Sequence, residues 1–215
     1  MRVIGHRGCP DHFPENTLAA VRGAAPRVDW IEIDVQRCAS DEIVVFHDET
    51  LARLTGASGR LRDTTVEALS KLTIGDSDEG IPTLAAVLDA LPAETGINVE
   101  VKHTGMAAEV AGMLEGVPQE ALVSAFDPAA LETVERVPTA LLFADSFERN
   151  IEQAGELGCD AVHPHRGLVD RGTVEMAHSR GFAVNTWTIR SREQAGRLRD
   201  AGVDGLIVDS WEVVE

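Results

Sequence analysis

Short β-branched runs alternate with amphipathic segments along nearly the whole chain, and this alternation restricts the fold more than any other feature. The candidate strands are residues 3–5, 30–35, 97–101, 122–125, 140–143, 161–163, 183–187 and 205–208. Apolar residues at helical spacing follow most of them, in residues 17–25, 84–91, 106–114, 128–136, 147–157, 173–180 and 192–201. Eight such strand units in a chain of 215 residues predict a (β/α)8 barrel.

Local signals mark where several of these helices begin and end. Thr83 and Ser191 precede helical segments and are suited to capping them, while Gly158, Gly181 and Gly202 follow helices. A doubly wound open sheet is the alternative architecture. It is disfavoured because no glycine-rich dinucleotide fingerprint follows the first strand.

One strand does not fit the alternation. Residues 43–46 follow the second strand too closely for a parallel crossover, so we expect a short extra antiparallel strand that delivers His47. Residues 49–82 are rich in Thr, Ser, Asp and Gly and contain one short helical piece, residues 65–72. We interpret this segment as an excursion over the barrel mouth within a single domain spanning residues 1–215.

The charge balance restricts the partners. A net charge of −17 argues against nucleic acid or an anionic membrane surface as the main partner, because phosphate binding depends on Lys and Arg. Lys71 and Lys102 are the only lysines, which favours a protein from a salt-loving microbe. An ordinary acidic protein from a GC-rich genome, with Arg in place of Lys, is the alternative.

No apolar run is long enough to span a bilayer, and no secretory leader is evident, so we expect a cytoplasmic protein without membrane insertion. Cys9, Cys38 and Cys159 are far apart, which fits a reduced compartment rather than disulfides or zinc. Cys9 lies near His6, so a catalytic thiol is one hypothesis. Whether the protein forms a homo-oligomer stays open.

Chargeable residues gather at the ends of the predicted strands. Glu32 and Asp34 share one face of the second strand, and Glu100 and Lys102 share one face of the third. Three converging carboxylates repel one another unless a cation binds, and oxygen ligands suit Mg²⁺ or Ca²⁺. The alternative for each pair is a solvent-exposed polar face or a buried Glu–Lys ion pair.

The same strand ends supply groups for acid–base chemistry on a phosphate. His6 and His47 can act as general base and general acid, because histidine titrates near neutral pH. Arg7 and Lys102 can provide positive charge for a phosphate. A divalent ion, two cations and two imidazoles are together typical of phosphodiester cleavage.

These residues stand in a set of motifs that covers nearly the whole chain. The chain resembles the glycerophosphodiester phosphodiesterases, which are phospholipase-C-like TIM barrels. The matching motifs are His6-Arg7-Gly8, Pro14-Glu15-Asn16-Thr17, Glu32-Ile33-Asp34-Val35, Val44-Val45-Phe46-His47-Asp48, Thr55-Gly56, Ile81-Pro82-Thr83-Leu84, Glu100-Val101-Lys102, Trp187-Thr188 and Gly202-Val203-Asp204-Gly205.

The resemblance implies metal-dependent hydrolysis of a small glycerophosphodiester to glycerol phosphate and an alcohol. It implies a divalent ion, Mg²⁺ or Ca²⁺, at Glu32, Asp34 and Glu100. The same resemblance places the acid–base pair at His6 and His47 and the phosphate contacts at Arg7 and Lys102. Water or the glycerol hydroxyl of the substrate is the first nucleophile; the sequence does not decide between them.

Three positions depart from the family pattern. The family often has Ser-Phe, Val-Asn and Thr-Asp-Pro where this chain has Ala125-Phe126, Ile189-Arg190 and Val208-Asp209-Ser210. These departures concern the pocket wall and the choice of substrate. Phe126 and Trp187 are candidates for apolar walls around the glycerol or head group, with barrel-top packing as the alternative.

Two other functions are consistent with parts of this pattern. A Schiff-base aldolase on the same barrel would use Lys102 as the nucleophile but leaves both histidines without a role. A phosphodiester-binding barrel without activity is the second alternative, and it is disfavoured because every reactive position is intact.

Overall fold

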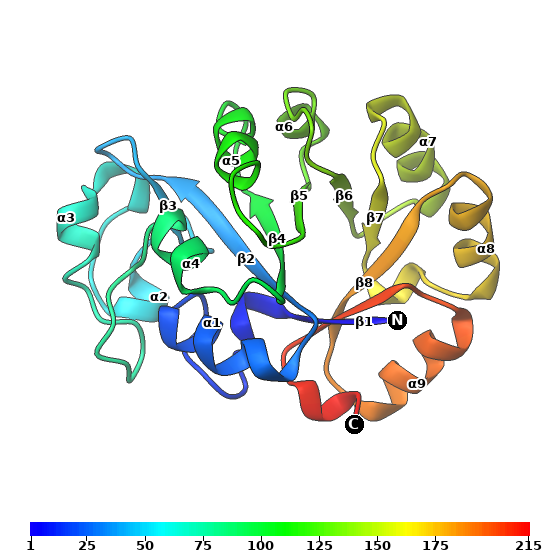
Figure 1. The fold of residues 1–215 in the computed structure, drawn as a ribbon, viewed down its shortest axis with the longest axis horizontal. Helices are drawn as coiled ribbons and strands as arrows, with labels where there is room; N and C mark the ends of the chain where they lie inside the picture. The colour runs from blue at the N-terminus through cyan, green and yellow to red at the C-terminus, as the bar shows by residue number, and fades with distance from the viewer.

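The computed structural model describes residues 1–215, and its centre is a closed barrel of eight parallel strands (Figure 1). The barrel strands are β1 (Arg2–Gly5), β2 (Trp30–Arg37), β4 (Gly96–Val101), β5 (Ala121–Ala125), β6 (Thr139–Phe143), β7 (Ala161–Pro164), β8 (Ala183–Ile189) and β9 (Gly205–Val208). Each strand pairs with its neighbour in chain order, and β9 and β2 both pair with β1. The predicted barrel is therefore confirmed.

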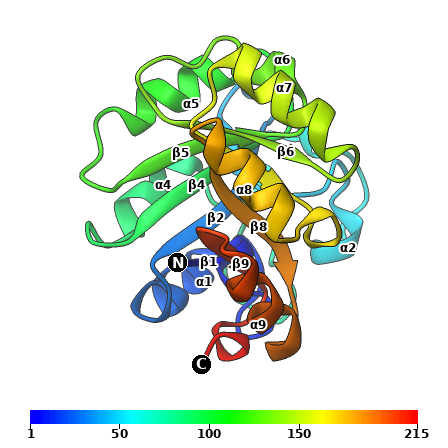
Figure 2. The same ribbon diagram turned by 90° about the vertical axis from the view of Figure 1, so that its right-hand side faces the viewer.

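Helices surround the barrel, as the view from the side shows (Figure 2). They are α1 (Leu18–Ala24), α4 (Leu84–Ala90), α5 (Ala107–Leu114), α6 (Pro128–Leu131), α7 (Phe147–Leu157), α8 (Arg171–Ser179) and α9 (Arg192–Ala201). The hydroxyls of Thr83 and Ser191 accept hydrogen bonds from the first turns of α4 and α9, as predicted. α6 is shorter than predicted because the β-branched Thr133 and Val134, and then Pro138, disfavour its continuation.

Most of the core lies between the barrel and its helices. There the outward-facing strand residues, such as Ile31, Ile33 and Val99, are fully buried against the helices. A smaller apolar group that includes Ile4, Trp30 and Ile207 occupies the inside of the barrel. Because successive strand residues alternate between these two faces, Glu32 and Asp34 project into the barrel and not into the outer core.

The extra antiparallel strand is β3 (Ile43–Val45), and it pairs with the far end of β2. Residues 49–82 form α2 (Ala52–Thr55), a 3-10 turn (Leu61–Asp63) and α3 (Val66–Leu69), which lie beside β3 at one flank of the barrel (Figure 1). Of these, only the region of α3 carried a helical signal in the sequence.

This flanking segment has an apolar core of its own. The core consists of the buried residues Cys38, Val44, Phe46, Leu51, Leu61, Leu69, Ile74 and Ile81. The segment contributes no residue to the lining of the cavity at the barrel mouth described below.

Candidate active site

A cavity of about 280 Å³ opens at the carboxyl ends of the barrel strands. Eight of the nine predicted site residues line it: His6, Arg7, Glu32, His47, Glu100, Lys102, Phe126 and Trp187. The ninth, Asp34, lies behind the lining with 1% of its surface exposed. The barrel therefore brings together residues from β1, β2, β4, β5 and β8 and from the loop after β3, as the sequence predicted.

Three carboxylates form the floor of the site. One oxygen each of Glu32, Asp34 and Glu100 lies within 4.8 Å of the others, and all three residues are buried. Burial and the charges of Asp34 and Glu100 raise the pKa of Glu32 well above its usual range. Burial and the charge of Asp34 raise the pKa of Glu100 to about 7. These shifts are what crowded acids produce when only protein cations balance them.

One oxygen of this trio has no partner inside the protein. Glu32 Oε1 is buried and accepts no hydrogen bond, whereas Glu32 Oε2 accepts the backbone N–H of Arg7 at 2.9 Å. An unsatisfied buried carboxylate oxygen is costly unless it binds a ligand. The donor set is all oxygen and has a high negative charge, so it fits a hard divalent cation such as Mg²⁺ or Ca²⁺.

Two side-chain cations adjoin the carboxylates. Lys102 Nζ lies 3.0 Å from Asp34 Oδ1 and 2.6 Å from Glu100 Oε1, and Arg7 Nε lies 3.1 Å from Asp34 Oδ2. Burial alone would raise the pKa of Asp34, but Lys102 and Arg7 outweigh it and hold that pKa below its usual range. The Glu–Lys ion pair considered from the sequence is present, but as one contact within this larger cluster.

The environment of Lys102 argues against the aldolase alternative. Burial lowers the pKa of Lys102, but the charges of Asp34 and Glu100 dominate and raise it above the usual lysine value. The side chain therefore remains an ammonium ion at neutral pH. An ammonium ion has no free electron pair with which to form a Schiff base.

The loop after β1 is shaped to direct Arg7 toward the carboxylates. Arg7 and Gly8 both have a positive φ, of 49° and 76°. A Cβ on Gly8 would lie 2.7 Å from the Cβ of Ala20 in α1, so only glycine fits between the loop and the helix. Asn16, in the same loop, donates from Nδ2 to Asp34 Oδ2 at 3.0 Å and thereby orients that carboxylate.

Each of the two histidines is held by its own aspartate. His6 Nδ1 lies 2.6 Å from Asp209 Oδ1, and His47 Nδ1 lies 2.7 Å from Asp48 Oδ1. An ionised carboxylate accepts a hydrogen bond from Nδ1–H, so the ring proton stays on Nδ1 and Nε2 of each ring is left as the basic nitrogen. Burial, opposed by Asp34 and reinforced by Lys102, lowers the pKa of His47.

Sequence reasoning missed the role of the residues that orient these groups. Asp209 could have been found, because it directly follows β9 as His6 directly follows β1, and Asp48 directly follows His47. Two arginines had no signal: Arg190 Nε donates to Asp209 at 2.6 Å, and Arg53 Nε donates to Asp48 at 2.5 Å. Nothing in a sequence shows which exposed arginine reaches back to which carboxylate.

An aromatic pair forms part of the cavity wall. The rings of Phe126 and Trp187 meet edge to face, with centroids 5.4 Å apart. Trp187 is fixed by a hydrogen bond from Nε1 to the carbonyl of His163, whereas Phe126 leaves 46% of its surface exposed. Phe126 packs on Trp187 and still leaves part of its ring accessible to a ligand in the cavity.

Two other titratable side chains, the candidate thiol Cys9 and the buried His163, do not belong to the reacting groups. Cys9 is completely buried, and burial with the nearby charge of Asp209 raises its pKa to about 12. It is a core residue, and a catalytic thiol is ruled out because the reactive form is the thiolate. His163 lies inside the barrel and bonds Asn185, and burial lowers its pKa to about 3.

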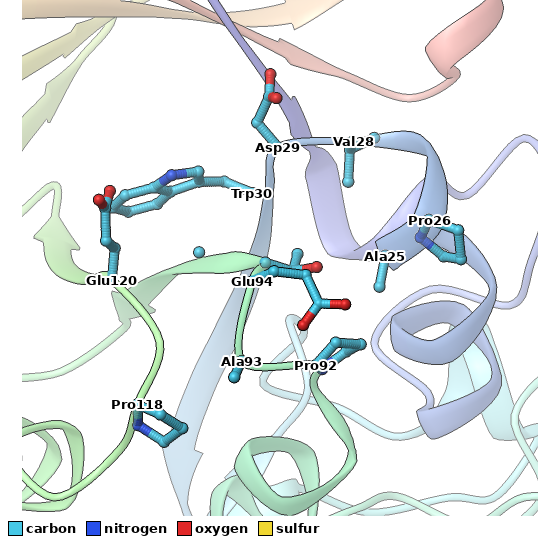
Figure 3. A pocket seen from close by; sticks show the side chains of 12 residues that line it. Ala25, Pro26, Val28, Asp29, Trp30, Pro92, Ala93, Glu94, Pro118 and Glu120 are labelled. Atoms are coloured by element: carbon cyan, nitrogen blue, oxygen red, sulfur yellow. The ribbon is translucent and has the colours of Figure 1, made fainter.

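A larger hollow, of about 600 Å³, lies at the other end of the barrel (Figure 3). It is lined near the start of β2 and β4 by Trp30, by several prolines, and by the acids Asp29, Glu94 and Glu120. No histidine, lysine or arginine lines it. Its size therefore does not make it the reaction site.

None of the helices combines the length and apolar character needed to cross a bilayer.

Known proteins share both the sequence pattern and the fold. The model of the glycerophosphoryl diester phosphodiesterase family matches residues 6–213. A glycerophosphodiester phosphodiesterase of Caldanaerobacter subterraneus is 29% identical, over 99% of this chain and 95% of its own length. One of Bacillus altitudinis is 27% identical, over 97% of this chain and 94% of its own.

Solved structures agree with these relatives. An Oleispira antarctica phosphodiesterase, determined with the product sn-glycerol-3-phosphate, superimposes with a TM-score of 0.92 and 26% identity, covering 100% of this chain and 95% of its own. A Thermotoga maritima glycerophosphodiester phosphodiesterase superimposes with a TM-score of 0.85 and 27% sequence identity. The match covers 99% of this chain and 96% of that protein's chain. Because the family model covers residues 6–213 and the barrel superimposes on these solved structures, the chain belongs to the glycerophosphoryl diester phosphodiesterase family.

Proposed function

We propose that this enzyme hydrolyses glycerophosphodiesters to glycerol phosphate and an alcohol with a divalent ion, Mg²⁺ or Ca²⁺, and with two histidines as acid and base. The observation that carries the proposal is the convergence of Glu32, Asp34 and Glu100 within 4.8 Å. The unsatisfied Oε1 of Glu32 supports it. These three residues would hold the ion, which would act as a Lewis acid and polarise a phosphoryl oxygen.

Arg7 and Lys102 would bind the phosphate. Both line the cavity, and both are kept as cations by the acids behind them. The guanidinium can bond two phosphate oxygens through its planar fork, and the ammonium adds a point charge. They place the phosphorus between the two imidazoles and stabilise the negative charge that grows during the displacement.

His6 and His47 would move the protons. Each ring presents Nε2, because an aspartate holds its Nδ1. One imidazole removes the proton of the attacking hydroxyl, and the other donates a proton to the oxygen of the departing alcohol. The same roles serve whether water or the substrate's own glycerol hydroxyl attacks first.

The aromatic wall suits the organic part of such a substrate. Phe126 and Trp187 offer an apolar surface in the same cavity as the charged groups. In the related Oleispira antarctica enzyme, the bound product is sn-glycerol-3-phosphate, which is the acid half of the substrates proposed here. We place the glycerol or the head group against this wall.

The metal requirement is tested by removal and return of the ion. We expect EDTA-treated enzyme to lose turnover of glycerophosphocholine and glycerophosphoethanolamine, and added Mg²⁺ or Ca²⁺ to restore it. Glu32→Ala should raise the ion concentration needed, whereas Glu156→Ala, on the exposed face of α7, should not. Full turnover after thorough chelation would disprove the metal assignment.

The acid–base roles are tested separately. His6→Ala and His47→Ala should each lower kcat by about 10²–10⁴-fold while the thermal unfolding midpoint stays close to that of the parent. His178→Ala is the matched control, because His178 is exposed on α8, pairs with Asp204 and is not among the residues that line the cavity. Wild-type kcat in either site variant would remove that histidine from the mechanism.

A further inference from the structure

One side chain of the flanking segment reaches the active-site groups. Arg53, in α2, donates to Asp48 through Nε at 2.5 Å and Nη2 at 2.9 Å. It also donates to Glu15 through Nη1 at 3.0 Å and Nη2 at 2.8 Å. A single guanidinium therefore binds two carboxylates, each with two hydrogen bonds.

Each of these carboxylates holds a group of the proposed mechanism. Asp48 binds Nδ1 of His47 at 2.7 Å, and Glu15 binds Nη1 of Arg7 at 2.9 Å. The contacts run without a break from the imidazole of His47, through Arg53, to the guanidinium that would bind phosphate. Asp48 and Glu15 are largely shielded, with 20% and 11% of their side chains exposed, so water screens these contacts only in part.

The chemistry of this junction requires an arginine. Asp48 and Glu15 repel each other if no cation lies between them. Hydrogen bonds from Arg53 are the main cause that brings the pKa of Asp48 down to about 2, so Asp48 remains an acceptor for His47 at every working pH. A lysine would neutralise the charge but could not fix two carboxylate planes at once.

The fold places Arg53 firmly although its side chain is 46% exposed. Leu51, just before α2, is buried in the apolar core of the flanking segment. The carbonyl of Leu54 accepts the backbone N–H of Gly75 at 2.8 Å. α2 is thus tied on both sides of Arg53.

The His6 side of the site has no equivalent. Arg190 contacts Asp209 in the same way, through Nε at 2.6 Å, but it binds no second carboxylate. Only Arg53 connects an imidazole to a phosphate-binding cation.

We propose that Arg53 is a positioning residue that sets His47 and Arg7 relative to each other. Residues 49–82 hold Arg53 in the place where it can do so. This inference rests on the proposed function.

Kinetics of Arg53 variants provide the first test. Arg53→Gln should lower kcat/KM for glycerophosphocholine by about 10–100-fold, because a displacement of about 1 Å at reacting groups has that effect. Both constants should change: kcat because His47 is misplaced, and KM because Arg7 is. The kcat/KM of Arg53→Lys should lie between that of the parent and that of Arg53→Gln. Arg62→Gln, in the same segment and paired only with Asp63 at 3.8 Å, should match the parent.

Chemical rescue separates positioning from a general loss of structure. Guanidinium chloride at concentrations well below those that unfold the protein should restore part of the kcat of Arg53→Ala, and sodium chloride at equal ionic strength should not. No rescue, together with unchanged KM and a lowered unfolding midpoint, would reduce Arg53 to a structural residue and overturn the inference.

A measurement independent of turnover completes the test. Nitrogen-15 NMR of the histidine side chains, at a pH where His47 is neutral, should show the proton on Nδ1 in the parent and a mixture of tautomers in Arg53→Gln. An unchanged tautomer would contradict the inference. If the parent enzyme turned over no glycerophosphodiester, the proposed function would fail, while this spectrum would still decide whether Arg53 orients His47.

Discussion

Two histidines of this site are each paired with an aspartate, and each aspartate is paired with an arginine. The pairs differ in origin. Asp48 is the chain neighbour of His47, whereas Asp209 comes from the strand at the other end of the chain from His6. In both, the carboxylate selects the tautomer that leaves Nε2 basic. The orientation of each imidazole is thus set by a carboxylate outside the cavity lining.

Replacement of Asp209 by asparagine tests this selection. The Arg190 Nε–H still needs an acceptor and would take the new amide oxygen, leaving the amide N–H₂ to face His6 Nδ1. That contact favours the opposite tautomer, with the proton on Nε2, so we expect kcat to fall by about 10²–10⁴-fold. Steady-state kinetics would show it. Asp76→Asn, on an exposed turn, is the control, and equal kcat in the two variants would refute the role of Asp209.

His163 makes a prediction about pH. Burial lowers the pKa of His163 from 6.5 to about 3. At a pH between these two values, His163 is protonated in the unfolded chain and neutral in the folded protein. The free energy of unfolding is therefore unaffected by His163 above pH 6.5 and falls as the pH drops toward 3, by up to about 1.4 kcal/mol per pH unit. His163→Gln should lose this part of the acid sensitivity.

Urea unfolding at neutral pH and at mildly acidic pH would measure this slope. His178→Gln serves as the control, because His178 is on the surface of α8. If the parent and His163→Gln lost the same stability on acidification, the buried neutral imidazole would not be the cause.

At the scale of elements, the barrel and the flanking segment are separate packing units. The main core joins the strands to the surrounding helices, while residues 49–82 bury a small core against β3. A separate core can open without unfolding of the barrel. Since α2 carries Arg53, the opening of this unit would also disturb His47 and Arg7.

Leu61→Ala tests whether the two units are independent. Leu61 is fully buried in the small core, and a truncation of this kind costs about 2–5 kcal/mol. We expect faster hydrogen exchange in residues 49–82, unchanged protection of the barrel strands, and a lower kcat. Leu198→Ala, in the main core, should instead reduce protection throughout the barrel. Loss of protection everywhere in Leu61→Ala would show a single cooperative unit.

At the scale of the whole molecule, charge is the dominant feature. The chain has 36 acidic against 19 basic side chains, and several of the basic ones are bound within the active site. Uncompensated surface carboxylates repel one another, and salt screens this repulsion. The thermal unfolding midpoint should therefore rise as sodium chloride increases from low to multimolar concentration. A flat or falling midpoint would favour codon bias over adaptation to salt.

The barrel and most of the site could be predicted because both follow from local patterns. β-branched runs and helical spacing are properties of adjacent residues, and the carboxyl ends of parallel strands always share one rim. That reasoning placed Glu32 and Glu100 at the rim, where both line the cavity. It did not find α2, because a helix of four residues in a polar segment has no periodicity, and it made α6 too long.

The amino-acid sequence by itself determined which side chains face the barrel mouth, since alternation along a strand decides the face of each residue. Only the tertiary structure decided which of them pair. His6 meets Asp209 across 203 positions, and Arg53 meets Glu15 across 38. These contacts exist because the barrel closes and a separate small core holds α2 beside it. Hydrogen bonds between charged side chains depend on distances of a few ångströms in space, and no periodicity along the chain records those distances.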